Sequence, residues 1–391
     1  MKSVGRQAMW MATALAGVLV ASSGCARPQV PESELLPVSP AAIGASGLEV
    51  LWQTELLMDA GRPLDALWLC GDFLVGRDTG NRIYAVSAKT GVRLWSEPVA
   101  AAHETVWPPA VDNGMLWVPT TTHLVGIEGL DGRVVRRLEL DFAPAGRPVT
   151  NGIHCFIPDA KGWLQAVSLA PKEPSWGRWT DDCVTAGPVL EGGLVCFGSQ
   201  DGVVYASAQN VRRIVWQYKT EGPILGDLKE APGGLVVVAS LDYTLYAFEG
   251  QVGRVVWRYH ASEPIRKSPY VFGEKPSGQP SAKPGGQAAP GGGQVFVLTR
   301  GAGLTALDAA DGRVQWRLAE GADVVTADDE TVYALGRGGN LLVVGRKDGQ
   351  VQFAFPVRRG TLAATNESAS GIVYLGTPEG WIIAVAKKKE P

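Results

Sequence analysis

Histidine, cysteine and paired acidic residues are the side chains best suited to metal binding or catalysis, so their spacing is the first test of function. The four histidines are scattered along the chain, and none lies at metal-ligand spacing from another histidine or a cysteine. They are His103, His123, His154 and His260. No Gly-x-Ser-x-Gly elbow, phosphate-binding loop or pair of catalytic carboxylates is present. We therefore predict no catalytic residue and no metal site, and we interpret Asp181-Asp182 as a solvated loop pair.

Four cysteines outside the N-terminal region leave two interpretations open. Cys70, Cys155, Cys183 and Cys196 contain no Cys-x-x-Cys or adjacent pair. In an exported protein they allow three disulfide pairings. Buried free thiols fit the same residues equally well.

The first 25 residues have the form of a secretory signal. Lys2 and Arg6 precede an apolar run, Met9 to Val20, that is too short to span a bilayer comfortably, and "ASSGC" follows it. The ending on Cys25 resembles a bacterial lipobox, which implies that this cysteine carries the lipid. The alternative is ordinary signal cleavage near Ala21 or Gly24. We predict a signal peptide over 1–24 and a lipid-anchored, proline-rich tether over 25–47.

A repeated phrase describes the rest of the chain. "YAVSAKTGVRLW" at 84–95 returns as "YAFEGQVGRVVW" at 246–257 and as "TALDAADGRVQW" at 305–316. Its last position recurs with steps of 43, 41, 43, 37, 41, 59 and 37 residues. The positions are Trp52, Trp95, Arg136, Trp179, Trp216, Trp257, Trp316 and Phe353. A period near 40 with about four short strands per unit predicts a propeller.

The two irregular features of the repeat have visible causes. The one long step contains a Gly/Pro-rich segment over 274–294, which we interpret as a disordered loop insertion. The chain also begins the repeat with a fourth strand near Leu48–Leu56 and ends with three strands over about 361–386. Pairing these ends would close the ring and remove two exposed edges. We therefore predict an all-β, eight-bladed propeller of four-stranded antiparallel blades over 48–387, followed by a short tail at 388–391.

The repeated tryptophans have a structural explanation. Trp95, Trp257 and Trp316 follow a turn glycine (Gly91, Gly253 and Gly312), and a small alanine lies in the preceding strand, as Ala306 does before Trp316. Burying such a ring removes about 150–250 Å² from water, so one ring per blade can lock neighbouring blades together. The predicted docking residues are Trp95, Trp216, Trp257 and Trp316.

The phrase Ala306-x-Asp308-x-x-x-Gly312-x-x-x-Trp316 resembles the tryptophan-docking repeat of the quinoprotein (PQQ-type) propellers. One branch binds PQQ and Ca²⁺, but this chain lacks the adjacent cysteine pair that many members carry. The chain is similar to the other branch, the BamB lipoprotein family, in length, lipobox-like start, eight units and composite last blade. It also has Phe353 in place of a tryptophan in the seventh unit.

The resemblance to BamB implies a function and a contact region. It implies a non-catalytic scaffold without a cofactor, anchored on the periplasmic face of the outer membrane, whose partner is a periplasmic domain of a BamA-like β-barrel assembly protein. The family's partner loops correspond to Thr180–Val184 and Glu221–Lys229. The candidate contact residues are Asp181, Asp182, Val184, Leu225, Asp227 and Lys229.

Other functions remain open at the level of sequence. A PQQ-type cofactor-binding enzyme or sensor and a cell-envelope ligand-binding module share the same fold signal. The formal net charge of −3 argues against a nucleic-acid partner, because such surfaces are normally basic.

Overall fold

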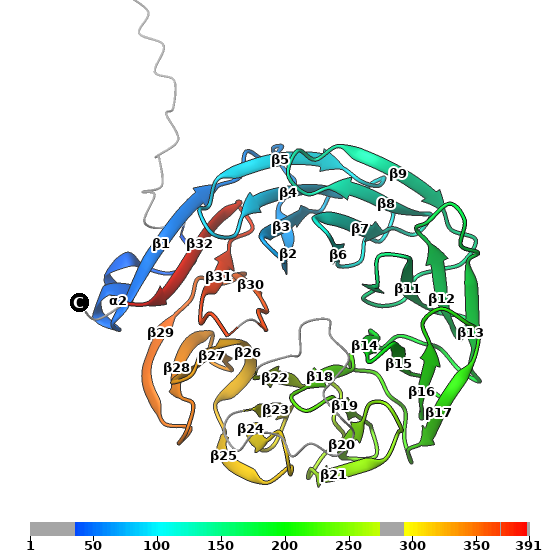
Figure 1. Cartoon of the computed structure of the whole chain (residues 1–391). Coiled ribbons are helices and arrows are strands. Elements are labelled where there is room, and N and C mark those ends of the chain that lie inside the picture. Colours follow the sequence, from blue (N-terminus) through cyan, green and yellow to red (C-terminus); the bar gives the residue numbers. More distant parts are fainter. Residues whose placement is uncertain (1–35, 274–292, 368, 389–391) are drawn as a thin grey trace, which may run out of the picture.

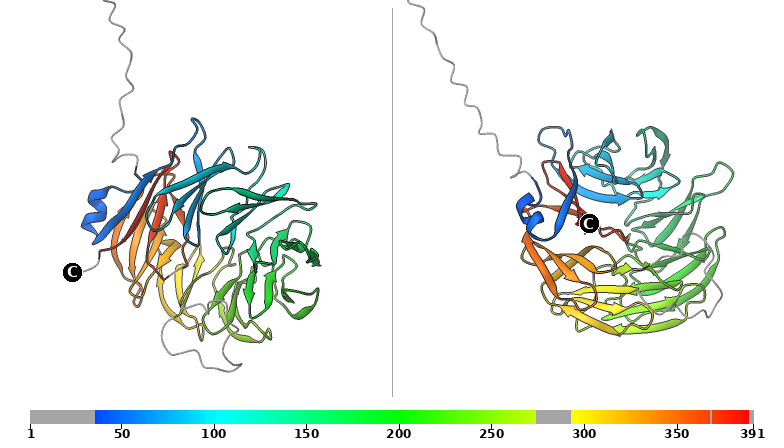
Figure 2. Two further views of the ribbon diagram at one scale, coloured as in Figure 1. Left: turned by 45° about the horizontal axis from the view of Figure 1, so that its top comes forward. Right: turned by 60° about the vertical axis from the view of Figure 1, so that its left-hand side comes forward.

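The computed structural model describes residues 36–273, 293–367 and 369–388. They form eight four-stranded antiparallel sheets arranged as blades of a ring, as Figure 1 shows. Two further views show the same ring tilted forward and turned to its side (Figure 2). The predicted fold class is confirmed. The signal peptide 1–24, Cys25 and nearly all of the 274–294 insertion lie outside the described residues.

In each of the first seven blades, strand 1 lines the central channel and strand 4 lies outermost. Blade 1 contains β2 (Leu64–Cys70), β3 (Phe73–Asp78), β4 (Arg82–Ser87) and β5 (Arg93–Pro98). Blade 2 contains β6 (Ala110–Asp112), β7 (Met115–Pro119), β8 (His123–Glu128) and β9 (Val134–Glu139). Blade 3 contains β10 (Val149–Thr150), β11 (His154–Asp159), β12 (Trp163–Ser168) and β13 (Trp176–Trp179). Blade 4 contains β14 (Val189–Glu191), β15 (Leu194–Gly198), β16 (Val203–Ala208) and β17 (Ile214–Lys219).

The second half of the ring continues the same order. Blade 5 contains β18 (Lys229–Ala231), β19 (Leu235–Ala239), β20 (Thr244–Glu249) and β21 (Val255–His260). Blade 6 contains β22 (Tyr270–Phe272), β23 (Gln294–Thr299), β24 (Gly303–Asp308) and β25 (Val314–Leu318). Blade 7 contains β26 (Gly321–Ala327), β27 (Thr331–Gly336), β28 (Asn340–Gly345) and β29 (Val351–Pro356). Blade 8 contains β30 (Leu362–Ala364), β31 (Val373–Gly376), β32 (Trp381–Lys387) and β1 (Leu48–Glu55).

The ring closes as the sequence predicts. β1 pairs with β32 in antiparallel register, from Leu48 opposite Lys387 to Glu55 opposite Trp381. The blue N-terminal strand and the red C-terminal strand therefore lie side by side in Figure 1. Closure leaves neither strand with an unpaired edge toward the interior of blade 8.

Docking between blades uses one hydrogen bond repeated around the ring. The indole N–H of five tryptophans donates to a carbonyl oxygen in the turn between strands 3 and 4 of the next blade. The pairs are Trp52 to Ala88, Trp95 to Gly129, Trp216 to Gly250, Trp257 to Ala309 and Trp316 to Arg346, at 2.7–3.0 Å. A glycine with positive φ stacks against each ring: a Cβ at Gly312 would lie 2.6 Å from Trp257. The predicted role of the docking tryptophans follows from these contacts.

The docking residue of blade 3 differs from the sequence prediction. Trp176 pairs with Ala166, as Trp216 pairs with Ala206 in the next blade. Trp179 lies three residues further on and is 55% exposed. The assignment of Trp179 to the docking position was therefore wrong. The turn before β13 carries extra residues and no glycine, so the sequence pattern gave the wrong register.

Two further blades dock without tryptophan. The guanidinium of Arg136 in β9 donates a hydrogen bond to the carbonyl oxygen of Leu169, which is the equivalent acceptor in blade 3. Phe353 in β29 has no N–H to donate and is 43% exposed. Its neighbour, blade 8, has no turn between strands 3 and 4, because the two ends of the propeller meet there. The missing acceptor explains why a tryptophan is not needed at this position.

Residues 36–47, before β1, are part of the folded body, which corrects the tether prediction for this part of 25–47; residues 25–35 lie outside the described residues. Leu36, Val38 and Ile43 are buried and pack with β28, β29 and blade 8. The short helix α2 (Pro40–Ala45) lies within this segment, and the N–H of Arg358 bonds to the carbonyl oxygen of Pro37 at 2.8 Å. In the sequence, the apolar residues Leu36, Val38 and Ile43 among the prolines were the signal that this segment packs against the propeller. This segment covers the seam between blades 7 and 8, where a docking turn is absent.

Candidate functional site

Three loops of equal length join the outer strand of one blade to the inner strand of the next. They are 180–188, 220–228 and 261–269, and together they are called here the connector surface. Strand direction alternates within each blade, so these loops lie on the same face as the turns between strands 2 and 3. Each loop has a fully buried apolar side chain at its middle position, Val184, Ile224 or Ile265.

A hydroxyl network fixes the start of each connector. The backbone N–H of Thr180 bonds to the carbonyl oxygen of Gly162 at 2.8 Å, and Ser199 Oγ lies 3.1 Å from the carbonyl oxygen of Asp182. The next connector repeats the arrangement with Thr220 and Ser240. These buried hydrogen bonds hold the loop backbone in one conformation.

Carboxylates in the neighbouring turns complete the network. Asp201 accepts from the backbone N–H of Asp181 at 3.1 Å and from the hydroxyl of Tyr205 at 2.8 Å. Burial and the Asp201 carboxylate raise the pKa of Tyr205, so this phenol stays protonated and keeps donating. Asp242 and Tyr246 repeat the pair in blade 5.

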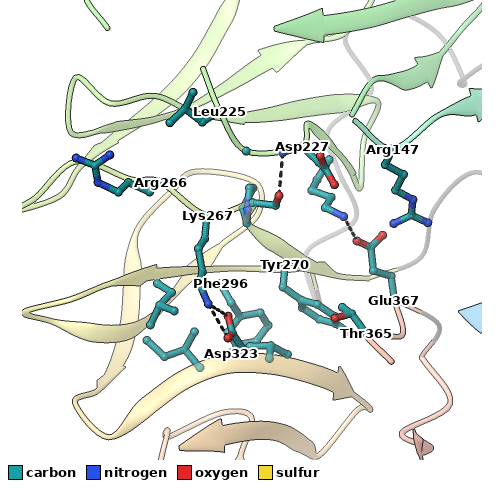
Figure 3. Close-up of a pocket in the computed structure, with 17 residues that line it drawn as sticks. Arg147, Leu225, Asp227, Arg266, Lys267, Tyr270, Phe296, Asp323, Thr365 and Glu367 are labelled. Atoms are coloured by element: carbon teal, nitrogen blue, oxygen red, sulfur yellow. Dashed lines mark hydrogen bonds and ion pairs between the residues drawn. The ribbon is translucent and has the colours of Figure 1, made fainter. Parts of the chain in front are cut away.

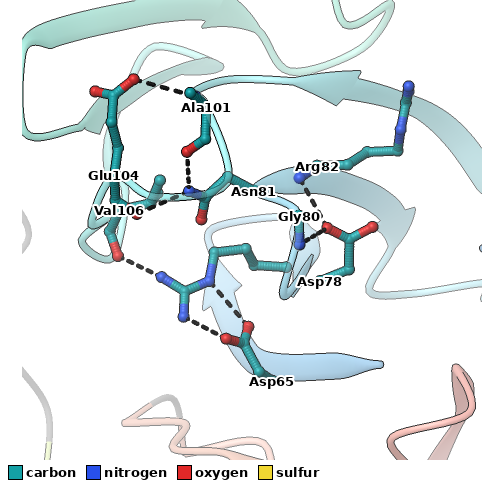
Figure 4. A network of polar contacts seen from close by, with 9 residues as sticks. Asp65, Asp78, Gly80, Asn81, Arg82, Ala101, Glu104 and Val106 are labelled. Carbon is teal, nitrogen blue, oxygen red and sulfur yellow. Dashed lines mark hydrogen bonds and ion pairs between the residues drawn. The ribbon is translucent and has the colours of Figure 1, made fainter. Parts of the chain in front are cut away.

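Blade 1 has a related arrangement, seen in Figure 4. Asp78 accepts the backbone N–H groups of Gly80 and Arg82, and the Asn81 side chain donates to the carbonyl oxygens of Ala101 and Glu104. Burial and Asp78 raise the pKa of Tyr84 to about 12. Hydrogen bonds between the turn of strands 2 and 3 and a neighbouring connector therefore recur in blades 1, 4 and 5.

The three loops of the connector surface are also bonded to one another. The N–H of Gly187 donates to Asp227 Oδ1 at 2.8 Å, and the N–H of Asp227 donates to Ser268 Oγ at 2.8 Å. A Cβ at Gly226 would lie 2.8 Å from the backbone nitrogen of Ser268. One aspartate thus joins three successive connectors into a continuous, rigid surface.

The structure divides the six predicted contact residues into three groups. Asp181 and Asp182 are exposed on the first connector. Val184 is fully buried in the core between blades 3 and 4, so it positions this connector and presents no surface. Leu225, Asp227 and Lys229 line a cavity at the central channel.

The channel cavity has a volume of about 380 Å³. Lys229 at the start of β18 forms an ion pair with Glu367, 2.6 Å away, in the turn that follows β30 (Figure 3). The Lys229 side chain is only 11% exposed. Removing one partner of such an enclosed pair leaves the other charge uncompensated. Lys229 is therefore a structural bridge across the channel rather than an exposed contact.

Two further bonds hold the turn of Glu367 in the channel. The hydroxyl of Tyr270 donates to the carbonyl oxygen of Asn366 at 2.7 Å, and the N–H of Asn366 bonds to Val325 at 2.8 Å. Lys267 and Asp323 form another ion pair at 2.6 Å, on the cavity wall. Sequence reasoning missed the ion pair between Lys229 and Glu367, because these two residues are far apart in the chain and belong to no local motif.

The described residues contain no group of three or more His, Cys, Asp or Glu side chains able to hold a metal ion. His154 is buried, and its Nε2 lies 3.1 Å from the carbonyl oxygen of Pro174. The four cysteines at 70, 155, 183 and 196 are free thiols. Within the part of the chain described, no helix has the length and apolar character to cross a membrane.

A family model described as "Outer membrane protein assembly factor BamB" matches residues 41–147, 160–274 and 272–389. The chain belongs to the BamB family. Among solved structures, BamB from Moraxella catarrhalis is similar at 14% identity and a TM-score of 0.65, covering 88% of this chain and 99% of that one. At such identity the likeness shows the fold alone.

A computationally designed protein, Ika8, has a similar fold. It is 13% identical, with a TM-score of 0.63, and the match covers 84% of this chain and 98% of that one. No curated protein sequence matches this chain. Membership of the BamB family, rather than the propeller fold, is therefore what bears on function.

Proposed function

We propose that this protein is a non-catalytic, lipid-anchored accessory of outer-membrane β-barrel assembly, facing the periplasm. In this role the connector surface binds a periplasmic domain of a BamA-like assembly protein. Family membership supports the assembly role. The lipobox-like sequence ending at Cys25 supports the anchor.

The observation that carries the proposal is the bonding of three connectors through Asp227. A preordered surface loses little conformational entropy when a partner binds, so a larger share of the contact energy appears as affinity. The exposed carboxylates of Asp181 and Asp182 lie on this surface, in the loop that corresponds to the family's partner loop.

The test is binding of recombinant periplasmic domains of the assembly protein from the same cells. The double change Asp181→Lys and Asp182→Lys should weaken binding at least tenfold without changing the melting temperature. A matched control changes Asp131 and Asp311 to lysine, since both lie in turns on the opposite face and are exposed. Lys229 is unsuitable as a probe, because reversing its charge would break the channel ion pair.

The anchor requires a separate test. Cys25→Ser should move the protein from the outer-membrane fraction to the soluble fraction, because attached acyl chains supply the membrane affinity. Fractionation that is the same for both forms would contradict the lipid anchor without bearing on the binding surface.

A further inference from the structure

Trp179 is an exposed indole that lies outside the docking position of its blade. It ends β13 and is 55% exposed, whereas Trp176 takes the docking position of the same blade. Tryptophan is usually well buried in folded proteins and is enriched among the residues that dominate binding energy at interfaces. An exposed tryptophan outside the docking position is therefore a candidate contact residue for a partner protein.

The residues that follow Trp179 give this surface its charge. Thr180 is buried and hydrogen-bonded, which fixes the backbone immediately after the indole. Asp181 and Asp182 come next, and neither carboxylate forms an ion pair with a described residue. Trp163, the cross-strand partner of Trp179, lies beside it and packs over Gly177. An exposed indole is therefore followed along the connector by two carboxylates that form no ion pair with a described residue.

We propose that Trp179 is the aromatic anchor of the connector surface and that it receives an arginine or lysine side chain of the bound partner. This inference rests on the proposed function and specifies the partner's chemistry. A cation over an indole face is attracted by the ring quadrupole, and tryptophan is the best of the aromatic residues for this contact. The carboxylates of Asp181 and Asp182 then form ion pairs with the same arginine or lysine. Their negative charge also raises the rate at which a basic segment of the partner is encountered.

The geometry separates this role from folding. The docking position is filled by Trp176 and Trp179 is 55% exposed, so removing the Trp179 indole should leave the docking contact between blades 3 and 4 in place. Phe353 offers a matched control, because it is also an exposed aromatic on an outer strand, but in blade 7. Both substitutions to alanine should leave the melting temperature close to that of the unchanged protein.

The experiment measures affinity for the recombinant periplasmic domains of the assembly protein. Trp179→Ala should weaken binding at least tenfold, Trp179→Phe should weaken it less, and Phe353→Ala should leave it unchanged. The change of Asp181 and Asp182 together to asparagine should lower affinity and flatten its dependence on salt, because screened charge pairs are being removed.

Three outcomes would overturn the inference. If the unchanged protein binds and Trp179→Ala binds as tightly as Phe353→Ala, the anchor is wrong while the proposed function stands. If lysines at 181 and 182 strengthen binding, the partner is not basic at this point. If the unchanged protein does not bind at all, the proposed function fails and the inference fails with it.

Discussion

The guanidinium of Arg136 donates a hydrogen bond to the carbonyl oxygen of Leu169 across the junction of blades 2 and 3. The indole of Trp95 donates to Gly129 in the same way at the junction before it, at 2.7 Å. An arginine therefore replaces the hydrogen bond of a docking tryptophan but not the burial of its ring.

This relationship predicts the effect of removing the arginine. Arg136→Ala should lower the free energy of unfolding by about 1–3 kcal/mol, because the bond to Leu169 is lost and the carbonyl loses its partner. Arg133→Ala is the control, since that side chain is 66% exposed and forms only surface ion pairs. Urea unfolding of both variants measures the difference, and equal stability would contradict the docking role of Arg136.

Two substitutions at a buried docking tryptophan should separate the contribution of ring burial to stability from that of the indole hydrogen bond. Trp257 is buried and donates to Ala309 at 2.9 Å. Trp257→Ala should lower the free energy of unfolding by about 3–5 kcal/mol through the cavity it leaves. Trp257→Phe keeps much of the apolar contact and should be less damaging than the alanine change. Thermal and urea unfolding would show this order, and equal damage from the two changes would argue against packing as the main contribution.

The segment before β1 should contribute to stability. Ile43 is 2% exposed within the cluster at the seam of blades 7 and 8, so Ile43→Ala should cost about 2–5 kcal/mol. Ser39→Ala is the neighbouring control, because the Ser39 side chain makes no capping hydrogen bond. A melting temperature unaffected by the isoleucine change would restore the tether interpretation for this segment.

Tyr243 is a residue whose replacement should stabilise the fold. Its φ of 73° lies in the left-handed region, where the equivalent positions in other blades hold Gly162, Gly202, Gly339, Gly380 or Asn81. A left-handed backbone costs a residue other than glycine about 1–2 kcal/mol. Replacement by glycine removes this cost, but part of the benefit is lost because glycine gives up more conformational entropy on folding. Tyr243→Gly should therefore raise the melting temperature slightly. Gly202→Ala should lower it, since its Cβ would lie 2.9 Å from the carbonyl oxygen of Gly222.

Thiol labelling should report the burial of the cysteines. Burial raises the pKa of the Cys70 thiol to about 12, and it also raises the pKa of Cys155 and Cys196. Cys183 is partly exposed, and partial burial followed by Asp182 raises its pKa. Among the four, only Cys183 should react with maleimide in the native state, faster as pH rises because the thiolate fraction grows. Asp182→Asn should speed the reaction, and native labelling of Cys196 would contradict its placement.

The repeat of about 40 residues was sufficient to predict eight blades and their closure, because propeller blades are local units whose turns and docking rings leave a periodic pattern. It misplaced Trp179, since the pattern of Trp and turn glycine breaks where blade 3 has extra residues and no turn glycine. The tether prediction erred for a related reason: prolines suggested extension, while Leu36, Val38 and Ile43 pack on blades 7 and 8, at the other end of the chain.

The candidate site was predictable only in part. Exposure of Asp181 and Asp182 follows from their charge, and their loop was identified by resemblance. The burial of Val184 was not predicted, although the apolar side chain recurs at Ile224 and Ile265 in the same place of each connector. The Lys229–Glu367 pair joins blades 5 and 8, and no local rule links two such residues.

The pairing of β1 with β32 also sets an order of events in time. The first strand of the propeller leaves the ribosome long before β32, with which it pairs, and before β30 and β31 of the same sheet. Contacts of such large sequence separation form slowly, because the intervening chain must be ordered first. Until then β1 and the apolar segment before it have no sheet to join. Blade 8 is therefore expected to assemble last, and β1 remains an unpaired strand until the C-terminal strands have arrived.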